Sequence, residues 1–337
     1  MGWFADEIGA TVHAIRLHTF GPAENLRYET VPDPVPGPGE VLIRVAAAGV
    51  HLIDTALRRG AAGPYPPPTL PTIPGREVAG TVDQIGPDVD ASWLGKLAVA
   101  HLGQRPGGYA ELAVTETARL HEIPAELDPA EAVAIVGTGR TTMGILLFTE
   151  LGPDSVVVIT AAAGGIGTLL VQHARNVGAT VVGLAGGPAK VELVQRNGAN
   201  IAIDYLRPDW PEQVRAQLGD RRATVLFDGV GGEISRTAID LLGKGGQHLI
   251  YGAAGSAPLS LSEQELASRG ITSEMVVGPR MLQRVGGDLR PLEDKAMAEA
   301  AAGRLRPAVQ RFALADAADA HRALESRGTV GKVVLQA

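Results

Sequence analysis

The sequence predicts an α/β protein with a β-rich N-terminal third and a doubly wound parallel sheet. The first third carries short strand-like segments between Gly- and Pro-rich turns, which is typical of β structure. From about residue 130 the pattern changes to compact apolar runs, each followed by an amphipathic stretch. Runs that are apolar throughout indicate strands buried on both faces, as in a parallel sheet covered by helices. A length of 337 residues suits about two domains.

The N-terminal third is expected to hold few helices. Residues 1–11 lack periodicity and are expected to form a non-structured extension to which we assign no function. The predicted strands are 12–20, 40–48 and 77–85, with a short helix at 52–59. The segment 63–74 contains six prolines, so it cannot join a central sheet and is expected to wrap the surface or line a cleft.

The later apolar runs recur at a regular spacing. They are 155–160, 180–184, 199–204, 223–228 and 247–251, with starts 25, 19, 24 and 24 residues apart. This spacing suits a strand–helix–strand repeat. Beyond about residue 280 the pattern predicts a helix, a strand, a helix and a final strand, at 292–302, 308–314, 315–326 and 331–335.

Composition and charge exclude several classes of function. The chain has 30 Lys and Arg against 37 Asp and Glu, a net charge of −7, and no basic block, which argues against nucleic acids and anionic membranes as partners. It has no cysteine, which excludes disulfides, a Cys nucleophile, Fe–S clusters and thiolate zinc sites. The longest apolar stretch, 156–171, is interrupted by glycines and is too short to span a bilayer. We therefore expect a cytoplasmic protein.

A glycine-rich loop follows the first of the regularly spaced runs. Residues 161–167 read Ala-Ala-Ala-Gly-Gly-Ile-Gly and lead into a helix with one apolar stripe. A strand, a tight glycine turn and a helix together indicate a dinucleotide site, because the pyrophosphate can bind the free N–H groups at the helix start. Four further strand–helix units strengthen this interpretation over that of a structural turn.

The end of the second run favours NADP(H). NAD sites keep a carboxylate there to hold the ribose hydroxyls, whereas residues 182–187 read Val-Gly-Leu-Ala-Gly-Gly. Lys190 follows closely, and its ammonium would attract a 2′-phosphate. The alternative is that Lys190 is a solvated residue of the next helix.

Several motifs in order make the chain from about Val12 to Leu335 resemble a medium-chain dehydrogenase/reductase of the zinc-free quinone oxidoreductase (zeta-crystallin-like) group. The matching stretches are 49–55 (GVHLIDT), 74–80 (PGREVAG), 107–111 (GGYAE), the loop 162–167, 320–325 (AHRALE) and 331–335 (GKVVL). The resemblance implies a GroES-like catalytic domain at 1–130 and 281–337. It also implies a Rossmann domain that binds NADP(H) at 131–280.

The resemblance also implies that zinc is absent. In zinc-dependent relatives the position of His51 is a Cys ligand and that of Arg76 is a His ligand. A guanidinium does not ligate zinc and would repel it. His51 and Glu77 beside that fixed charge do not make a metal site, so the metal-binding residues are predicted to be none.

The resemblance assigns cofactor contacts to individual residues. Lys190 and Tyr205 match residues that contact the 2′-phosphate. Thr141 and the stretch 251–256 resemble the nicotinamide side of the site. The full predicted set is Thr141, Ala163, Gly164, Gly165, Ile166, Gly167, Lys190, Tyr205, Tyr251, Gly252 and Ser256.

On this scaffold the expected reaction is hydride transfer from NADPH to a quinone or an α,β-unsaturated carbonyl. The substrate oxygen gains negative charge and needs a hydrogen-bond donor or a proton. Water and the residues His51, Tyr65 and Arg76 are candidates, with Asp54 as the partner of His51. Each residue has a structural alternative: Tyr65 packing on prolines, His51 bonded to Asp54, and Arg76 paired with Asp54 or Glu77.

Two departures from the family put quinone specificity in question. Many quinone oxidoreductases have Asn at the position of His51 and Tyr at that of Ala56. An enoyl-thioester reductase and a non-catalytic NADPH-binding protein, crystallin-like or regulatory, therefore remain open. The expected partners are a small electrophilic substrate and further copies of the chain, because the family is usually dimeric or tetrameric through strands near residues 271–278.

Overall fold

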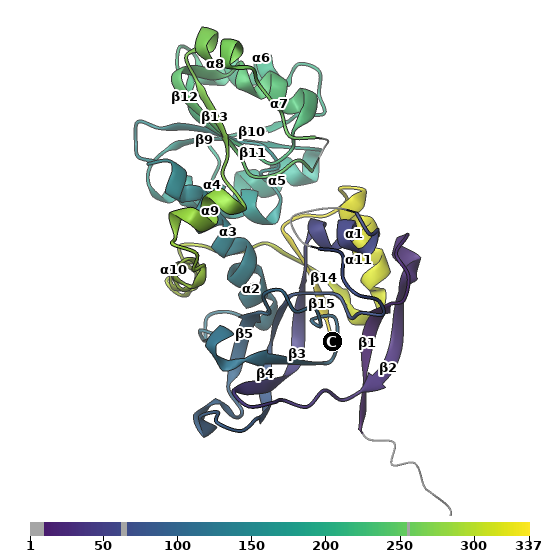
Figure 1. Ribbon diagram of the computed structural model, residues 1–337. Helices are drawn as coiled ribbons and strands as arrows, with labels where there is room; N and C mark the ends of the chain where they lie inside the picture. Colours follow the sequence, from purple (N-terminus) through teal and green to yellow (C-terminus); the bar gives the residue numbers. More distant parts are fainter. Residues whose placement is uncertain (1–9, 62–65, 255–256) are drawn as a thin grey trace, which may run out of the picture. The chain divides into compact units, whose positions relative to one another are not determined.

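The computed structural model describes residues 10–61, 66–254 and 257–337, which form two compact units (Figure 1). The discontinuous unit comprises Met1–Gly137 and Val309–Ala337. The inserted unit comprises Thr138–Ala308. The chain thus passes between the units at 137/138 and 308/309, whereas the sequence placed these passages near 130 and 281.

The second difference has a structural cause. Helix α10 (Arg290–Ala301) belongs to the inserted unit, where it packs against α3 (Arg140–Ile145). Arg140 and Glu293 join the two helices through an ion pair of 3.0 Å between side chains that are both largely buried. Helix α10 follows the last strand of the parallel sheet along the chain but belongs to the inserted unit, so this unit ends later than the sequence predicted.

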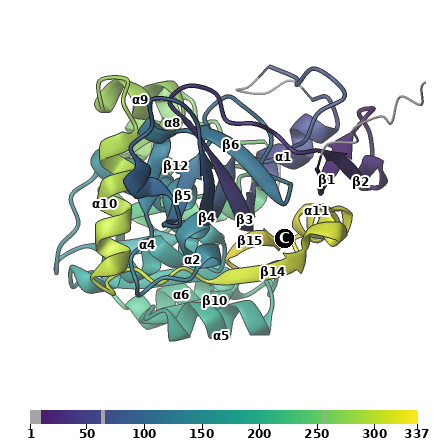
Figure 2. The same cartoon turned by 90° about the horizontal axis from the view of Figure 1, so that it is seen from below.

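A mixed sheet forms the centre of the discontinuous unit, in the order β14-β15-β3-β4-β5-β7, with β6 also paired to β3. Figure 2 shows β14 and β15 beside β3 and β4, so the C-terminal tail completes a sheet that the N-terminal third begins. A separate hairpin, β1 with β2, packs alongside. The strands are β1 (Thr11–Leu17), β2 (Leu26–Pro32), β3 (Glu40–Val50), β4 (Glu77–Ile85), β5 (Leu97–His101), β6 (Leu112–Glu116), β7 (Leu120–Glu122), β14 (Val309–Ala313) and β15 (Lys332–Gln336).

Helices and turns complete this unit. The helix predicted at 52–59 is α1, and the one predicted at 315–326 is α11. The proline-rich segment lies outside the sheets in its described part, apart from one bridge between Leu17 and Thr72. The helices are α1 (Leu52–Arg58), α2 (Pro129–Val133) and α11 (Ala317–Glu325), with short 3₁₀ turns at Ala23–Asn25, Ala91–Trp93, Thr117–Arg119 and Leu314–Asp316.

The inserted unit is a parallel sheet in the order β10-β9-β8-β11-β12-β13. All five predicted runs are strands of this sheet, and the α/β fold class is confirmed. The strands are β8 (Val156–Ile159), β9 (Thr180–Ala185), β10 (Ile201–Asp204), β11 (Ala223–Asp228), β12 (Leu242–Ile250) and β13 (Thr272–Met275). The helices are α3, α4 (Gly165–Asn176), α5 (Pro188–Arg196), α6 (Trp210–Leu218), α7 (Gly232–Ile239), α8 (Glu263–Arg269), α9 (Pro279–Arg284) and α10.

Strand β13 and the first half of strand β12 have no apolar run in the sequence that would have predicted them. Strand β13 reads Thr-Ser-Glu-Met and lies at the edge, where a strand need not be apolar on both faces. Strand β12 begins five residues before its predicted start, because its first half, Leu-Gly-Lys-Gly-Gly, consists mostly of glycine with one lysine and gives no apolar run.

One helical run, Pro129–Phe148, is long and apolar enough to cross a membrane by composition. It consists of α2, a π-helical turn at Ala134–Gly139, α3 and a 3₁₀ turn at Leu146–Phe148. Within its most apolar window 72% of the run is buried inside the protein. Such burial is what a core helix shows.

Candidate active site

The carboxyl ends of β8 and β11 define the ligand-binding edge of the inserted unit. In the sheet, β8 lies between β9 and β11. Along the chain, β9 and β10 follow β8 on one side of it, and the chain then crosses to β11 on the other side. The direction of winding therefore reverses between β8 and β11. Ligands of open parallel sheets bind at such a point, outside the carboxyl ends of the strands.

The glycine loop joins β8 to α4 at this point. Gly164 is the N-terminal capping residue of α4, and Gly167 lies in its first turn. A Cβ on Gly167 would lie 2.2 Å from the carbonyl oxygen of Ala161 and 2.7 Å from the Cα of Ala162. Only glycine fits this approach of helix to loop. The loop therefore presents the first N–H groups of α4, which have no partner within a helix, to an anionic group.

The turn between β9 and α5 carries the features expected for the 2′-phosphate. Strand β9 ends at Ala185 without a carboxylate, and Lys190 lies in the first turn of α5. The ring of Tyr205 packs against Gly186, since a Cβ there would lie 3.2 Å from the tyrosine hydroxyl. The nearby carboxylate of Asp204 accepts hydrogen bonds from the N–H groups of Gly187 (2.9 Å) and Leu206 (3.0 Å). It stabilises the backbone of this turn.

A buried network that sequence reasoning missed supports the same edge. Asp228, at the end of β11, accepts hydrogen bonds from the Thr160 hydroxyl (2.9 Å) and from Nε2 of His248 (3.1 Å). Burial opposes its ionisation, but the hydrogen bonds from His248 and from the backbone N–H of Val230 lower the pKa of Asp228 below its usual value. Asp228 thus holds the ends of β8 and β11 together.

The predicted nicotinamide-side residues lie in two parts of the inserted unit. Thr141 is in α3, and Tyr251 and Gly252 follow β12. The Tyr251 hydroxyl donates to the carbonyl of Thr160 at 2.8 Å, which places this side chain at the end of β8. Ser256 lies outside the described residues, and its assignment stays a prediction.

In the discontinuous unit, His51 contacts Glu77, which the sequence interpretation sets beside it, and Lys332, which that interpretation does not. Its Nε2 lies 2.6 Å from Oε1 of Glu77 and 2.7 Å from Nζ of Lys332. The same ammonium lies 2.8 Å from Oε2 of Glu77. The side chains of Glu77 and Lys332 are 0% and 5% exposed, whereas that of His51 is 30% exposed. His51 is therefore the accessible member of a buried charged cluster.

Strand register explains the cluster. Val333 of β15 pairs with Val50 of β3, so Lys332 lies opposite His51. On the other side of β3, Ala48 pairs with Val78 of the antiparallel strand β4. Glu77, one residue before Val78, therefore lies opposite Gly49. The contact of Lys332 with His51 could have been predicted only with the strand order known.

The charge of Glu77 is set by its surroundings. Burial alone would raise the pKa of Glu77, but its electrostatic interactions with His51 and with the ammonium of Lys332 hold it well below its usual range. Both contacts to its oxygens are close yet poorly aligned for hydrogen bonds, so their contribution is chiefly Coulombic.

Asp54 takes part in a second buried network. Its Oδ2 accepts hydrogen bonds from the backbone N–H of His51 (2.8 Å) and the hydroxyl of Tyr109 (3.1 Å). The expected bond between Asp54 and His51 therefore involves the histidine backbone. Because Tyr109 donates to a carboxylate, its oxygen is left to accept from Nε2 of His321 at 3.2 Å. Arg58 then faces the other ring nitrogen at 3.5 Å.

In this network the uncharged rings of Tyr109 and His321 lie between two charged groups, Asp54 and Arg58. Burial lowers the pKa of His321 to about 4, so the ring is neutral at pH 7. Burial, with the charge of Asp54, raises the pKa of Tyr109 well above its usual value. Arg58 donates to Glu325 at 2.6 Å, which ties α1 to α11. The network fixes the position of Asp54.

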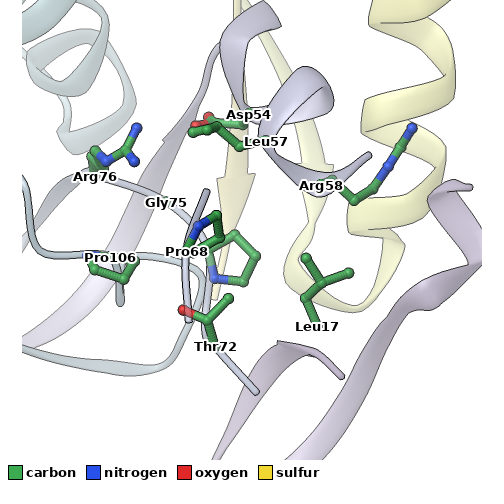
Figure 3. A pocket seen from close by; sticks show the side chains of 10 residues that line it. Leu17, Asp54, Leu57, Arg58, Pro68, Thr72, Gly75, Arg76 and Pro106 are labelled. Atoms are coloured by element: carbon green, nitrogen blue, oxygen red, sulfur yellow. The ribbon is translucent and has the colours of Figure 1, made fainter. Parts of the chain in front are cut away.

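Asp54 and Arg76 line the same pocket of the discontinuous unit (Figure 3). The pocket is small, with an interior volume of about 20 Å³, and it opens in part to solvent. Its lining combines apolar side chains with three charged groups, those of Asp54, Arg58 and Arg76, and small-molecule sites show such a mixture. The lining residues are Leu17, Asp54, Leu57, Arg58, Pro68, Thr72, Pro74, Gly75, Arg76 and Pro106.

The pocket brings together some predicted catalytic residues and leaves others apart. Asp54 and Arg76 share it, whereas His51 joins it only through its backbone bond to Asp54. The proline-rich segment contributes Pro68, Thr72 and Pro74, so its described part does line a pocket. Tyr65 lies outside the described residues.

The residues present do not fit a catalytic zinc ion. Within residues 10–61, 66–254 and 257–337 no three His, Cys, Asp or Glu side chains are grouped so that they could hold a metal. The two donors at the position in question, His51 and Glu77, already contact the ammonium of Lys332. A second cation between the same donors would be repelled.

Comparison with known proteins agrees with this arrangement of two units. Residues 37–125 match the family described as the alcohol dehydrogenase GroES-like domain, and residues 165–287 match the zinc-binding dehydrogenase family. A quinone oxidoreductase of Pseudomonas aeruginosa is 32% identical over 95% of this chain and 98% of its own length. A 2-haloacrylate reductase of a Burkholderia species is 31% identical over 96% and 98%.

Among solved structures, Escherichia coli quinone oxidoreductase complexed with NADPH superposes with a TM-score of 0.82 at 27% identity. The match covers 97% of this chain and 100% of that chain. The protein therefore belongs to the medium-chain dehydrogenase/reductase superfamily, in its quinone oxidoreductase group. It is an NADPH-dependent oxidoreductase, and the predicted NADP(H) cofactor is confirmed.

Proposed function

We propose that the protein reduces a quinone or an α,β-unsaturated carbonyl with NADPH and without zinc. The observation that carries this proposal is the His51–Glu77–Lys332 cluster, in which a protein ammonium stands between the donors that a metal would need. The printed names of the relatives agree with this substrate class: quinones and 2-haloacrylates both carry a conjugated acceptor.

Each unit supplies one part of the proposed reaction. When bound, NADPH supplies the hydride. In the inserted unit, the glycine loop and the first turn of α4 bind the pyrophosphate, and Lys190 and Tyr205 bind the 2′-phosphate. In the discontinuous unit, apolar side chains of the pocket contact the body of the acceptor. His51 and Arg76 donate hydrogen bonds to the oxygen on which negative charge develops.

The substrate class is tested by following NADPH oxidation across quinones, enones and enoyl thioesters. The proposal expects turnover with quinones or enones that exceeds turnover with thioesters. Dominant turnover of coenzyme A thioesters would assign the protein to the enoyl-thioester reductases. Tight NADPH binding without turnover of any acceptor would assign it a non-catalytic role.

Arg76 tests the role of the pocket. Arg76→Met keeps the length of the side chain and removes the charge, so kcat for enones is expected to fall about 10- to 100-fold with unchanged Kd for NADPH. Arg44→Met is the matched control, because Arg44 is 60% exposed and pairs with Asp83 on the surface. An unchanged kcat in Arg76→Met would remove Arg76 from the site.

We further infer a cytoplasmic protein that forms a homodimer or homotetramer. The absence of cysteine is compatible with a reducing compartment. Strand β13 lies at the edge of its sheet, and its Met275 is 38% exposed, so a second copy could extend the sheet there. Light scattering tests this proposal; a monomer at all concentrations would contradict it.

A further inference from the structure

The charged cluster of the discontinuous unit is built from three separate segments. His51 follows β3, Glu77 begins β4 and Lys332 begins β15, and 281 residues separate His51 from Lys332. Since β15, β3 and β4 are neighbours in the sheet, the three side chains meet at one end of it. The cluster thus depends on the return of the C-terminal tail to the N-terminal sheet.

The ammonium has a fixed position. Its main counter-ion, Glu77, is fully buried and enclosed by two glycines, because a Cβ on Gly49 or Gly137 would lie 2.2 Å or 1.5 Å from a carboxylate oxygen. The carboxylate therefore has little room to move. Lys332, at 2.8 Å from it and 5% exposed, is held with it.

Lys332 contacts His51 directly, so its positive charge acts on this imidazole at short range, with Glu77 in contact with both groups. The ammonium nitrogen lies 2.7 Å from the imidazole, which is a hydrogen-bond distance; a zinc ion would require about 2.0–2.1 Å. The cation thus contacts one imidazole and one carboxylate, as a metal would. The 30% of the His51 side chain that is exposed provides a surface at which a substrate oxygen can bind.

We propose that Lys332 is a positioning residue of the reaction: its ammonium, held by Glu77, orients His51 and supplies the fixed positive charge that favours a developing oxyanion at the exposed edge of this imidazole. This inference rests on the proposed function. It assigns to Lys332 the electrostatic role that a metal ion plays elsewhere, while no metal is required. Oriented charge of this kind lowers a barrier because it need not reorganise during the reaction.

A structural role for Lys332 must be separated from this one. Removing Lys332 alone would leave the buried carboxylate of Glu77 without its ammonium partner, and breaking a buried ion pair in this way is strongly destabilising. The test therefore compares Lys332→Met with the double variant Lys332→Met/Glu77→Gln, in which both charges are absent. Lys332→Arg restores the charge on a different side chain. Lys96→Met is the matched control, because Lys96 forms an exposed ion pair with Glu122.

The experiment measures Tm, the Kd for NADPH by fluorescence, and kcat with whichever quinone or enone the wild type reduces best. The double variant is expected to regain the wild-type Tm, to keep the wild-type Kd, and to show kcat about 10- to 100-fold below that of the wild type. Lys332→Arg is expected to recover most of this loss, and Lys96→Met to match the wild type.

Two results would overturn the inference. Wild-type kcat in the double variant would show that Lys332 only neutralises Glu77. A raised Kd for NADPH with unchanged kcat would make Lys332 a cofactor ligand. Absence of turnover by the wild type itself is a different result, because it refutes the proposed function on which the inference rests.

Discussion

The two units position their functional groups in different ways. In the inserted unit, backbone geometry dominates: the glycine loop, the first turn of α4 and the β9–α5 turn are each continuous in sequence. In the discontinuous unit, side chains from distant segments meet, as His51 does with Lys332 and Tyr109 with His321. A cofactor site of the first kind can be read from local pattern, whereas the second kind depends on tertiary structure.

The largest expected effect tests the backbone-built site. In Gly167→Ala the added Cβ meets backbone atoms at 2.2 and 2.7 Å, which cannot be relieved by a side-chain rotation. The loop must shift, and the affinity for NADPH is expected to fall about 100-fold through lost contacts to the pyrophosphate. Fluorescence titration measures this. Gly152→Ala is the control, because nothing lies within 4 Å of its added Cβ; equal Kd values for the two variants would refute the assignment.

The next effect concerns acid stability of the discontinuous unit. Burial lowers the pKa of His321 to about 4 in the folded protein, while its ordinary value is 6.5. As pH falls, His321 of the unfolded chain is therefore protonated at a higher pH than His321 of the folded protein. The free energy of unfolding decreases between about pH 6.5 and about pH 4, by roughly 3 kcal/mol in total. Urea unfolding across this range should show a shallower loss in His321→Gln than in the wild type. His18→Gln, at an exposed histidine, should keep the wild-type slope.

A smaller effect is expected from the hydroxyl between Asp54 and His321. Tyr109→Phe leaves both groups without this partner at a fully buried position, so the free energy of unfolding should fall by about 2 kcal/mol. Looser orientation of Asp54 should also lower kcat without changing the Kd for NADPH. Tyr28→Phe is the control at an exposed tyrosine. A Tyr109→Phe variant as stable as the wild type would exclude this network as a support of the pocket.

The smallest effect concerns the choice of cofactor. Lys190→Met removes the ammonium from the first turn of α5, so the Kd for NADPH should rise about tenfold while that for NADH is unchanged. Parallel fluorescence titrations with both nucleotides check this. Wild-type protein that binds NADH as tightly as NADPH would contradict the role of Lys190.

The same contrast explains how much the sequence could reveal. The five apolar runs of the parallel sheet were predictable because burial on both faces leaves an uninterrupted apolar pattern, whereas edge strand β13 leaves none. The glycine loop was predictable because its constraint is local. Glu77 was recognised only as an insufficient metal ligand, whereas Lys332 was not assigned to the site, since only the order β15-β3-β4 brings it to His51. Asp228 was missed for the same reason.

The central claim is that this oxidoreductase transfers hydride without a metal, and it is tested most directly by turnover after metal removal. Protein dialysed against a chelator, with its zinc content measured, is assayed with NADPH and a quinone or enone. The His51–Glu77–Lys332 cluster predicts that kcat is unchanged by dialysis and by added zinc. Loss of activity on dialysis, restored by stoichiometric zinc, would contradict it.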